Sequence, residues 1–208
     1  SMATMQRPVV DANTIIIDNG KLKLYVARHG RNLIDSLIMD GKKICDGAHL
    51  VATTTNATYA SVVDSAVVER AGSSRALIKI CGTMSDGSRR WLPFTLRLYA
   101  YAANEQLRMV HSFIYDGDQD KDFISSLGLT FDVPLRKETY NRHVMFAMDG
   151  GKMWHEPVQP LDGRSPLDRN YNWQERQQAG FEIPAANTFD ERQQTFLSEW
   201  ASWDGFRL

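Results

Sequence analysis

The sequence predicts an all-β protein, an antiparallel β-sandwich followed by a long loop-rich C-terminal segment. Apolar and polar residues alternate with period two through most of the first two thirds of the chain, as in strands with one buried face. Short turn signals separate these runs, and strands joined by short turns pair antiparallel. From Leu161 onward the sequence is polar and rich in Gln, Asn and Arg. This composition without a sustained period is typical of long loops.

Two hairpin signals open the chain. The run Thr14–Val26 places two strand-like segments on either side of Asn19-Gly20, and the run Leu33–Gly47 repeats the pattern around Asp40-Gly41. Asn-Gly and Asp-Gly favour the positive φ angles that tight primed turns require. The sequence therefore predicts two β-hairpins in this region.

Four longer alternating runs follow, separated by "SDGS", "AANE" and an aspartate-rich stretch: 75–84, 90–101, 105–115 and 123–135. Their period predicts an antiparallel meander in which each strand turns one apolar face to the core. The residues expected in the core are Leu96, Leu98, Met109 and Phe113. His111 shares their face, and a histidine there is more often a hydrogen-bonded core residue than a ligand. One short helix is expected near 189–200.

Composition and charge exclude several classes of function. The 24 basic and 25 acidic residues leave a net charge of −1, which argues against bulk binding to nucleic acid or to an anionic membrane. No apolar run is long enough to span a membrane, and no secretory signal opens the chain. The two cysteines, Cys45 and Cys81, lack metal-ligand spacing, so no zinc site is expected. Both are expected to be inert buried thiols.

The stretch "YDGDQDKD" sets aspartates at every second position from Asp116 to Asp122. An EF-hand calcium loop that begins at Asp116 requires Gly at its sixth position and Glu at its twelfth, but these positions hold Lys121 and Leu127. Aspartate and glycine are also the residues that strand-connecting turns prefer. The stretch is therefore predicted to be a turn without a cofactor or metal, and a loosely bound calcium ion remains the alternative.

Several blocks between Leu92 and Arg164 carry a family resemblance: "RMVHSFIYDGD", "KDFISSLGLTFDVPL", "YNRHVMF" and "EPVQPL". This region resembles the central β-sandwich of exo-acting rhamnogalacturonan lyases of polysaccharide lyase family 26. The preceding stretch, 18–44, is similar to the end of the barrel-like N-terminal domain of that family. The resemblance implies a division into residues 1–60, the end of the N-terminal barrel-like domain, and residues 61–208, the central sandwich. It also implies that the chain is an excised fragment of a longer protein.

The resemblance implies β-elimination on galacturonate-containing pectin. That reaction requires a base, a group that neutralises the uronate carboxylate, and an acid for the leaving oxygen. Within "YNRHVMF", Arg142 suits a carboxylate clamp, His143 a proton shuttle and Tyr140 an acid. Structural roles for Arg142 and His143 remain open, with Arg142 paired to an aspartate and His143 in the interior.

Substrate contacts are expected from a second set of residues. Trp154, His155 and Glu156 combine an aromatic platform with hydrogen-bonding groups, which suits sugar recognition. Arg97 alternates with Tyr99 on one sheet face, where basic and aromatic residues suit an acidic sugar chain. An ordinary solvated sheet face has the same composition.

The partners implied by the resemblance are an acidic polysaccharide and the α/α toroid that follows the sandwich in this family. The toroid is absent from this sequence, so the fragment alone is expected to be inactive. The full-length protein is expected to be extracellular or periplasmic, since pectin is its substrate. The alternative is a non-catalytic β-sandwich module that binds carbohydrate or a protein.

Overall fold

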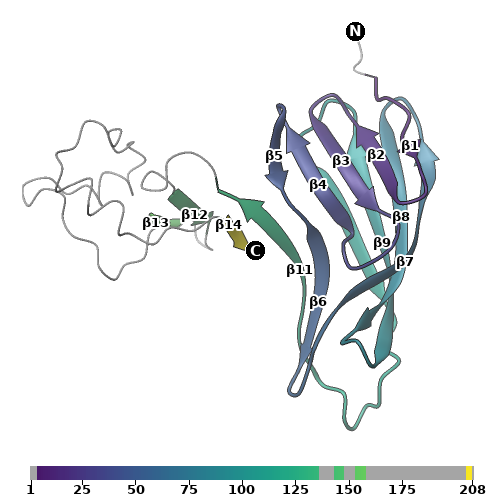
Figure 1. The fold of residues 1–208 in the computed structure, drawn as a ribbon, viewed down its shortest axis with the longest axis vertical. Coiled ribbons are helices and arrows are strands. Elements are labelled where there is room, and N and C mark those ends of the chain that lie inside the picture. Colours follow the sequence, from purple (N-terminus) through teal and green to yellow (C-terminus); the bar gives the residue numbers. More distant parts are fainter. Residues whose placement is uncertain (1–3, 136–142, 148–152, 158–204, 208) are drawn as a thin grey trace, which may run out of the picture. The chain divides into compact units, whose positions relative to one another are not determined.

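The computed structural model describes residues 4–135 and the strands at 143–147, 153–157 and 205–207 (Figure 1). Strands are the dominant element in these ranges, and no helix occurs in them. No segment there could therefore cross a membrane as a helix. The strands are β1 (Val9–Val10), β2 (Thr14–Asp18), β3 (Leu22–Ala27), β4 (Ile34–Met39), β5 (Lys42–Cys45), β6 (Ala48–Thr54), β7 (Thr58–Ala71), β8 (Arg75–Ser85), β9 (Arg90–Tyr101), β10 (Leu107–Phe113), β11 (Ile124–Pro134), β12 (His143–Ala147), β13 (Met153–Pro157) and β14 (Gly205–Arg207).

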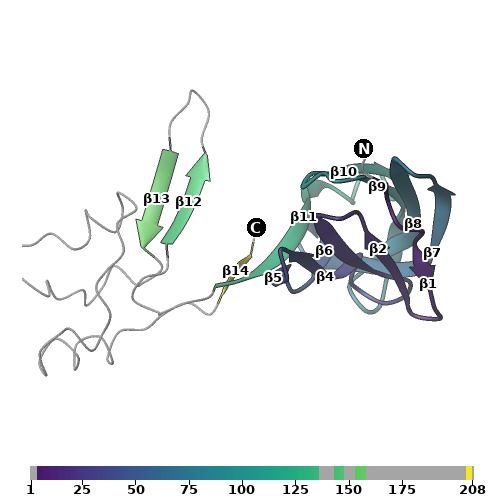
Figure 2. The same cartoon turned by 90° about the horizontal axis from the view of Figure 1, so that it is seen from above.

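The chain divides into two compact units. The first comprises Ser1–Pro134 with Arg207–Leu208, and the second comprises Leu135–Phe206. In the first unit one antiparallel sheet runs in the order β1-β2-β3-β4-β6-β7-β8-β9-β10, with β5 beside β4 and β11 beside β6. The sheet curls so that β2–β4 lie across the core from β7–β9 (Figures 1 and 2). The predicted all-β, antiparallel sandwich class is confirmed.

The core follows the predicted alternation along β9. Leu96 and Leu98 are 1% and 0% exposed, which confirms that both lie in the core. Met109 on β10 is half-buried against it. The prediction for Phe113 is wrong, because its side chain is 43% exposed. Phe113 ends β10, and β10 is the edge strand of the sheet, so no further strand covers its outer edge.

The two predicted hairpins are confirmed, but their turns differ. Asp40 and Gly41 have φ angles of 49° and 72°, as a primed turn requires. At the first turn only Gly20 is left-handed, with φ of 89°. There the buried Asn19 side chain accepts the N–H of Leu22 at 2.7 Å and donates to the carbonyl of Tyr101 at 2.9 Å. Asn19 therefore ties the hairpin to the end of β9.

The predicted meander extends from β6 to β10 and stops there. β11 does not pair with β10; it pairs antiparallel with β6, with Leu129 opposite Leu50. The aspartate stretch is therefore a connection between non-neighbouring strands, which corrects the expected continuation of the meander. The expected domain boundary after residue 60 falls within β7, and the division into residues 1–60 and 61–208 stays a prediction.

Candidate functional site

The residues predicted to be catalytic belong to the second unit. Tyr140 and Arg142 lie outside the described residues, and His143 is the first residue of β12. The predicted helix near 189–200 and the loop-rich segment from Leu161 also lie outside the described ranges, except for β14. The catalytic roles therefore stay predictions.

A two-stranded antiparallel sheet holds three of the predicted substrate contacts. β13 carries Trp154, His155 and Glu156, and it pairs with β12. The register places Met145 opposite His155 and His143 opposite Pro157. Strand pairing thus brings the segment that begins at His143 beside the segment that was predicted to contact sugar.

Arg97 lies in the first unit, on the side of β9 away from the core. Its Nε donates to Oε2 of Glu69 on β7 at 3.1 Å, and both side chains are about one-third exposed. The hydrogen bond from Arg97 lowers the pKa of Glu69, and the same contact raises the pKa of Arg97. Arg97 is therefore partly neutralised where it lies, and its role as a substrate contact stays a prediction.

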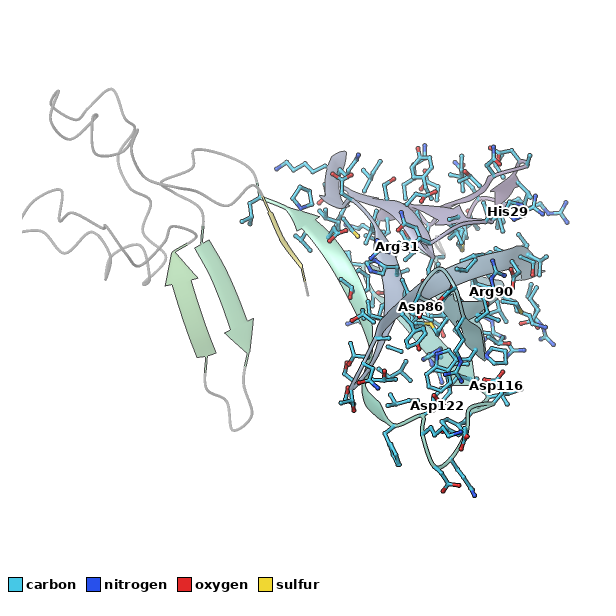
Figure 3. The ribbon with its side chains drawn as sticks, turned by 60° about the horizontal axis from the view of Figure 1, so that its bottom comes forward. His29, Arg31, Asp86, Arg90, Asp116 and Asp122 are labelled. Carbon is cyan, nitrogen blue, oxygen red and sulfur yellow. The ribbon has the colours of Figure 1, made fainter. Side chains whose placement is uncertain are left out.

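The aspartate stretch is a loop closed by hydrogen bonds, and Figure 3 labels Asp116 and Asp122 at its two ends. Asp122 accepts two hydrogen bonds from Arg89, both at 2.7 Å, and a third from the N–H of Asp118 at 2.7 Å. The side chain of Asp122 is 15% exposed. The Arg89 guanidinium carbon also lies 4.5 Å from the ring centroid of Trp91. A bidentate arginine–carboxylate contact of this kind fixes the relative orientation of the two side chains in addition to pairing their charges.

Asp116 holds the other end of this loop. Its Oδ1 accepts the N–H of Leu92 at 2.7 Å. Leu92 is 1% exposed and has φ of 50°, in the left-handed region that costs a branched residue free energy. The carboxylate therefore stabilises a strained backbone at the start of β9. The prediction of a strand-connecting turn is confirmed.

No group of three or more potential metal ligands occurs within the described part of the chain. In the loop, Asp116 and Asp122 already accept hydrogen bonds from the protein, and Asp118 accepts the N–H of Asp120 at 2.9 Å. A calcium ion would have to replace these donors. The expectation that no EF-hand-type calcium binds here stays a prediction.

Asparagine at position 122 should weaken the loop in a pH-dependent way. The hydrogen bonds from Arg89, and next that from the Asp118 N–H, lower the pKa of Asp122 from 3.8 to about 2. A lowered folded-state pKa stabilises the fold fully above the unfolded-state pKa, and this stabilisation is lost as the pH falls through the folded-state value. We expect Asp122→Asn to lower the melting temperature at pH 6, and the difference from wild type to shrink between pH 4 and pH 2.

The matched control is Asp120→Asn, in the same loop. The Asp120 carboxylate accepts no hydrogen bond from the described residues, so this change should leave the melting temperature near the wild-type value at each pH. Asp86 and Glu69 also have lowered pKa values, so the difference between variants, measured by circular dichroism, is the informative quantity. A constant difference from pH 6 to pH 2 would contradict the pairing.

His111 faces the core, as expected, but its buried Nε2 has no hydrogen-bond partner among the described residues. Its ring stacks on Phe113 at 5.6 Å and meets the edge of Phe94 at 6.0 Å. Burial lowers the pKa of His111, so the neutral ring predominates at pH 7. Within the described part of the chain the expected hydrogen bond is not found at Nε2, and the ring packs against Phe94 and Phe113.

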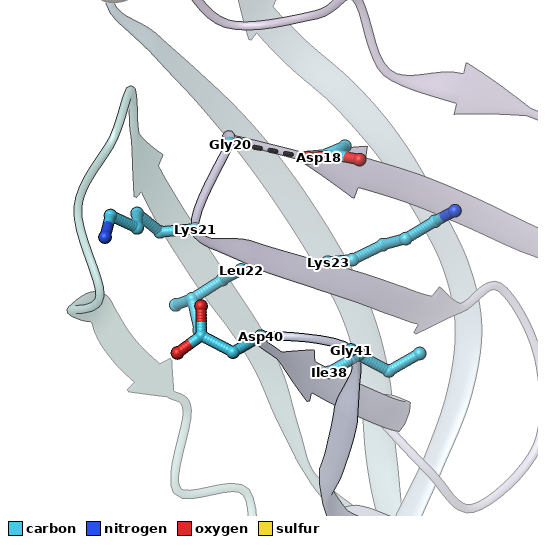
Figure 4. Close-up of a pocket in the computed structure, with 8 residues that line it drawn as sticks. All are labelled: Asp18, Gly20, Lys21, Leu22, Lys23, Ile38, Asp40 and Gly41. Atoms are coloured by element: carbon cyan, nitrogen blue, oxygen red, sulfur yellow. Dashed lines mark hydrogen bonds between the residues drawn. The ribbon is translucent and has the colours of Figure 1, made fainter.

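A shallow pocket of about 260 Å³ lies between the β2–β3 and β4–β5 turns (Figure 4). Lys21, Lys23, Asp18 and Asp40 line it, so its formal charges cancel. Lys21 also lies 3.7 Å from Glu105. None of the predicted site residues lines this pocket, and its lining contains no histidine or cysteine.

Residues 9–208 match the family model described as the PcRGLX-like protein central beta sandwich domain. The chain belongs to this family. It is accordingly the central β-sandwich of a rhamnogalacturonan lyase-like protein. The curled antiparallel sheet of the first unit agrees with that description. Family membership covers both units, including the strands on which His143 and Trp154 lie.

A relative is known from a bacterium. The chain is 32% identical over 177 residues to the "Uncharacterized protein YetA" of Bacillus subtilis strain 168. The match covers 78% of this chain and 20% of that relative. The chain therefore spans about a fifth of the length of the curated relative that it matches.

Two residues of the Asp116–Asp122 loop environment were not singled out by the sequence. Arg89 directly precedes β9 and donates to Asp122, and Trp91 is the second residue of β9 and packs against Gly117 of the loop. The sequence contains one pattern that could have indicated this contact: the basic and aromatic segment "RRW" is followed, after the next two strand-like runs, by a turn rich in aspartates. That signal does not specify which arginine pairs with which carboxylate.

Proposed function

We propose that this chain is the β-sandwich region of a pectin lyase that cleaves rhamnogalacturonan by β-elimination. The observation that carries the proposal is the match of residues 9–208 to the central sandwich of PcRGLX-like proteins. The resemblance of "YNRHVMF" and "EPVQPL" to exo-acting lyases of polysaccharide lyase family 26 supports it. The partner is then an acidic polysaccharide, and the full-length protein works outside the cytoplasm.

In this reaction a base removes the proton α to the uronate carboxylate. The electron pair of that C–H bond forms a carbon–carbon double bond, the bond from the next carbon to the glycosidic oxygen breaks, and the leaving oxygen takes up a proton. His143 is assigned to proton transfer, Arg142 to the carboxylate and Tyr140 to the leaving oxygen. These groups match the three requirements of the chemistry.

Trp154, His155 and Glu156 are assigned to substrate binding. Their strand pairs with the strand that begins at His143, so a sugar that contacts one strand lies within reach of the other. Arg97 is assigned to attraction of the acidic chain, since its pairing with Glu69 is partly exposed. No cofactor is required, and loosely bound calcium stays an alternative.

The chain alone is proposed to be inactive. Elimination requires groups held within about 0.5 Å of productive geometry and shielded from water. A chain that spans about a fifth of its relative's length supplies contacts but little of that enclosure. The second candidate is a non-catalytic module that binds carbohydrate or a protein. The basic residues on the solvent side of β8–β10 favour this second candidate, because such residues can bind an acidic ligand without any catalytic residues.

The test compares this chain with the full-length parent protein. Both are incubated with rhamnogalacturonan, and ultraviolet absorbance of the unsaturated uronate is followed. We expect the absorbance to rise with the parent and to stay flat with the chain alone at equal concentration. If the parent protein releases no unsaturated product, the lyase proposal is refuted and the binding module is favoured. If the chain alone releases product, the rest of the protein is not needed for activity.

A further inference from the structure

Basic residues are concentrated on four consecutive strands of the first unit. β7–β10 carry six Arg or Lys residues and two Asp or Glu residues, in a chain whose totals are 24 and 25: Asp64, Glu69, Arg70, Arg75, Lys79, Arg90, Arg97 and Arg108. The excess is therefore local to this part of the sheet and does not follow from overall composition.

The strand register places most of these residues on one face. Arg70 lies opposite Leu77, Leu77 opposite Tyr99, and Tyr99 opposite Arg108, in one row across four strands. Directly opposite residues share a face of a sheet. At an average strand spacing of about 4.8 Å, this row spans roughly 14 Å.

A second row runs beside the first, two residues further along β8 and two residues back along β9. Lys79 lies opposite Arg97. The alternate residues of β8 and β9, including Ile78 and Leu96, are buried in the core, so both rows lie on the solvent side. We call the solvent side of β7–β10 the basic face: Glu69, Arg70, Arg75, Lys79, Arg97, Tyr99 and Arg108.

Both acidic residues of these strands are already paired. Glu69 binds Arg97 at 3.1 Å, and Asp64 lies 3.3 Å from Arg90. No carboxylate of the described residues lies within 4.0 Å of the charged groups of the four remaining cations, Arg70, Arg75, Lys79 and Arg108. The basic face therefore has unneutralised positive charge on a protein of net charge −1.

An aromatic ring lies among these cations. The guanidinium carbon of Arg108 lies 5.4 Å from the ring centroid of Tyr99, a cation–π contact between neighbouring strands. Tyr99 is half-buried, so part of this residue is accessible to solvent. A surface that combines cations with a ring suits an extended ligand with carboxylates and apolar C–H groups.

We propose that the basic face is an accessory binding surface for a polyuronate chain, formed by residues of the first unit. The inference rests on the proposed function for the identity of its ligand. Unpaired Arg70, Arg75, Lys79 and Arg108 meet the sugar carboxylates, and Tyr99 meets a sugar C–H face. Such a surface retains an acidic polymer near the protein through many weak contacts.

The test measures binding of the intact chain to polygalacturonate by isothermal titration calorimetry. The probe for charge is the fully methyl-esterified polymer, which has the same backbone without carboxylates. We expect binding to the acidic polymer that weakens as salt is raised, and none to the ester, because exposed charge pairs are screened. The variant Lys79→Gln with Arg108→Gln should bind about tenfold more weakly, since each exposed pair contributes a few-fold at low salt.

The matched control is Arg7→Gln with Lys42→Gln, which changes the net charge equally. Both residues lie outside β7–β10. The control should bind as the wild type does, and unchanged melting temperatures establish that both variants fold. Equal loss in variant and control, no effect in the variant, or comparable binding to single-stranded DNA would each overturn the proposal.

Failure of this inference is distinguishable from failure of the proposed function. If the full-length parent releases unsaturated product but the chain binds no polygalacturonate, only the accessory surface is refuted. If the chain binds and the parent releases no product, the lyase assignment is refuted and the basic face stands.

Discussion

Replacing Trp91 by alanine is expected to lower the free energy of unfolding by about 3–5 kcal/mol, the range for removal of a buried tryptophan. Trp91 is 2% exposed. Its ring meets Tyr59 edge-on at 5.4 Å and Tyr115 at 6.0 Å, and Arg89 lies over it at 4.5 Å. The loop packs so closely on the indole that a Cβ added at Gly117 would lie 2.7 Å from it. The Ala variant therefore loses buried area and leaves a cavity beneath the loop.

Phenylalanine at the same position is the matched control. The indole Nε1 of Trp91 is buried and has no hydrogen-bond partner among the described residues, so its loss leaves no acceptor unpaired. We expect Trp91→Phe to cost about 1–2 kcal/mol, from the smaller ring alone. Urea unfolding followed by far-ultraviolet circular dichroism measures both variants. Equal stability of wild type and Trp91→Ala would contradict the packing.

Replacing Arg142 by alanine in the full-length parent should cost about 2–5 kcal/mol of transition-state stabilisation if the guanidinium pairs with a desolvated uronate carboxylate. That loss corresponds to a decrease in kcat/KM of about 30-fold to several thousand-fold. Loss of one partner of a buried charge pair leaves the other charge uncompensated, which is why the expected effect is large.

Lysine at position 142 separates charge from geometry. It keeps the positive charge but cannot form the bidentate contact, so its kcat/KM should lie between those of the wild type and the Ala variant. Initial rates of absorbance increase with rhamnogalacturonan provide the measurement, together with the melting temperature of each variant. A lower melting temperature with intact turnover would show that Arg142 has a structural role.

Two features account for the main differences between the sequence-based predictions and the structure: β10 is an edge strand, and β11 pairs with β6 and not with β10. Phe113 fits the alternation of β10 as well as Met109 does, but β10 has no outer neighbour and Phe113 ends it. The period of a strand specifies which face a residue lies on. It does not specify whether anything covers that face.

The candidate site was predictable only in part for a similar reason. The family resemblance pointed to the segments "YNRHVMF" and "EPVQPL" as parts of the site. The structure adds that β12, which begins at His143, pairs with β13, which carries Trp154. The basic face was not predicted as a whole, although Arg97 and Tyr99 were noted. Its cations come from four strands, and their proximity depends on strand register, which one strand's sequence does not contain.

By itself, the sequence determined the all-β class, the inward face of β9 and the Asp40-Gly41 turn. These features depend on backbone geometry between near neighbours, where side chains alternate and Gly tolerates positive φ. The tertiary structure decided that β11 pairs with β6, that Arg89 binds Asp122, and that Asn19 holds the end of β9. The bond from Arg89 joins residues 33 positions apart, and the bond from Asn19 joins residues 82 positions apart. Local preference cannot select among such distant partners, because the selection depends on how the whole sheet curls and packs.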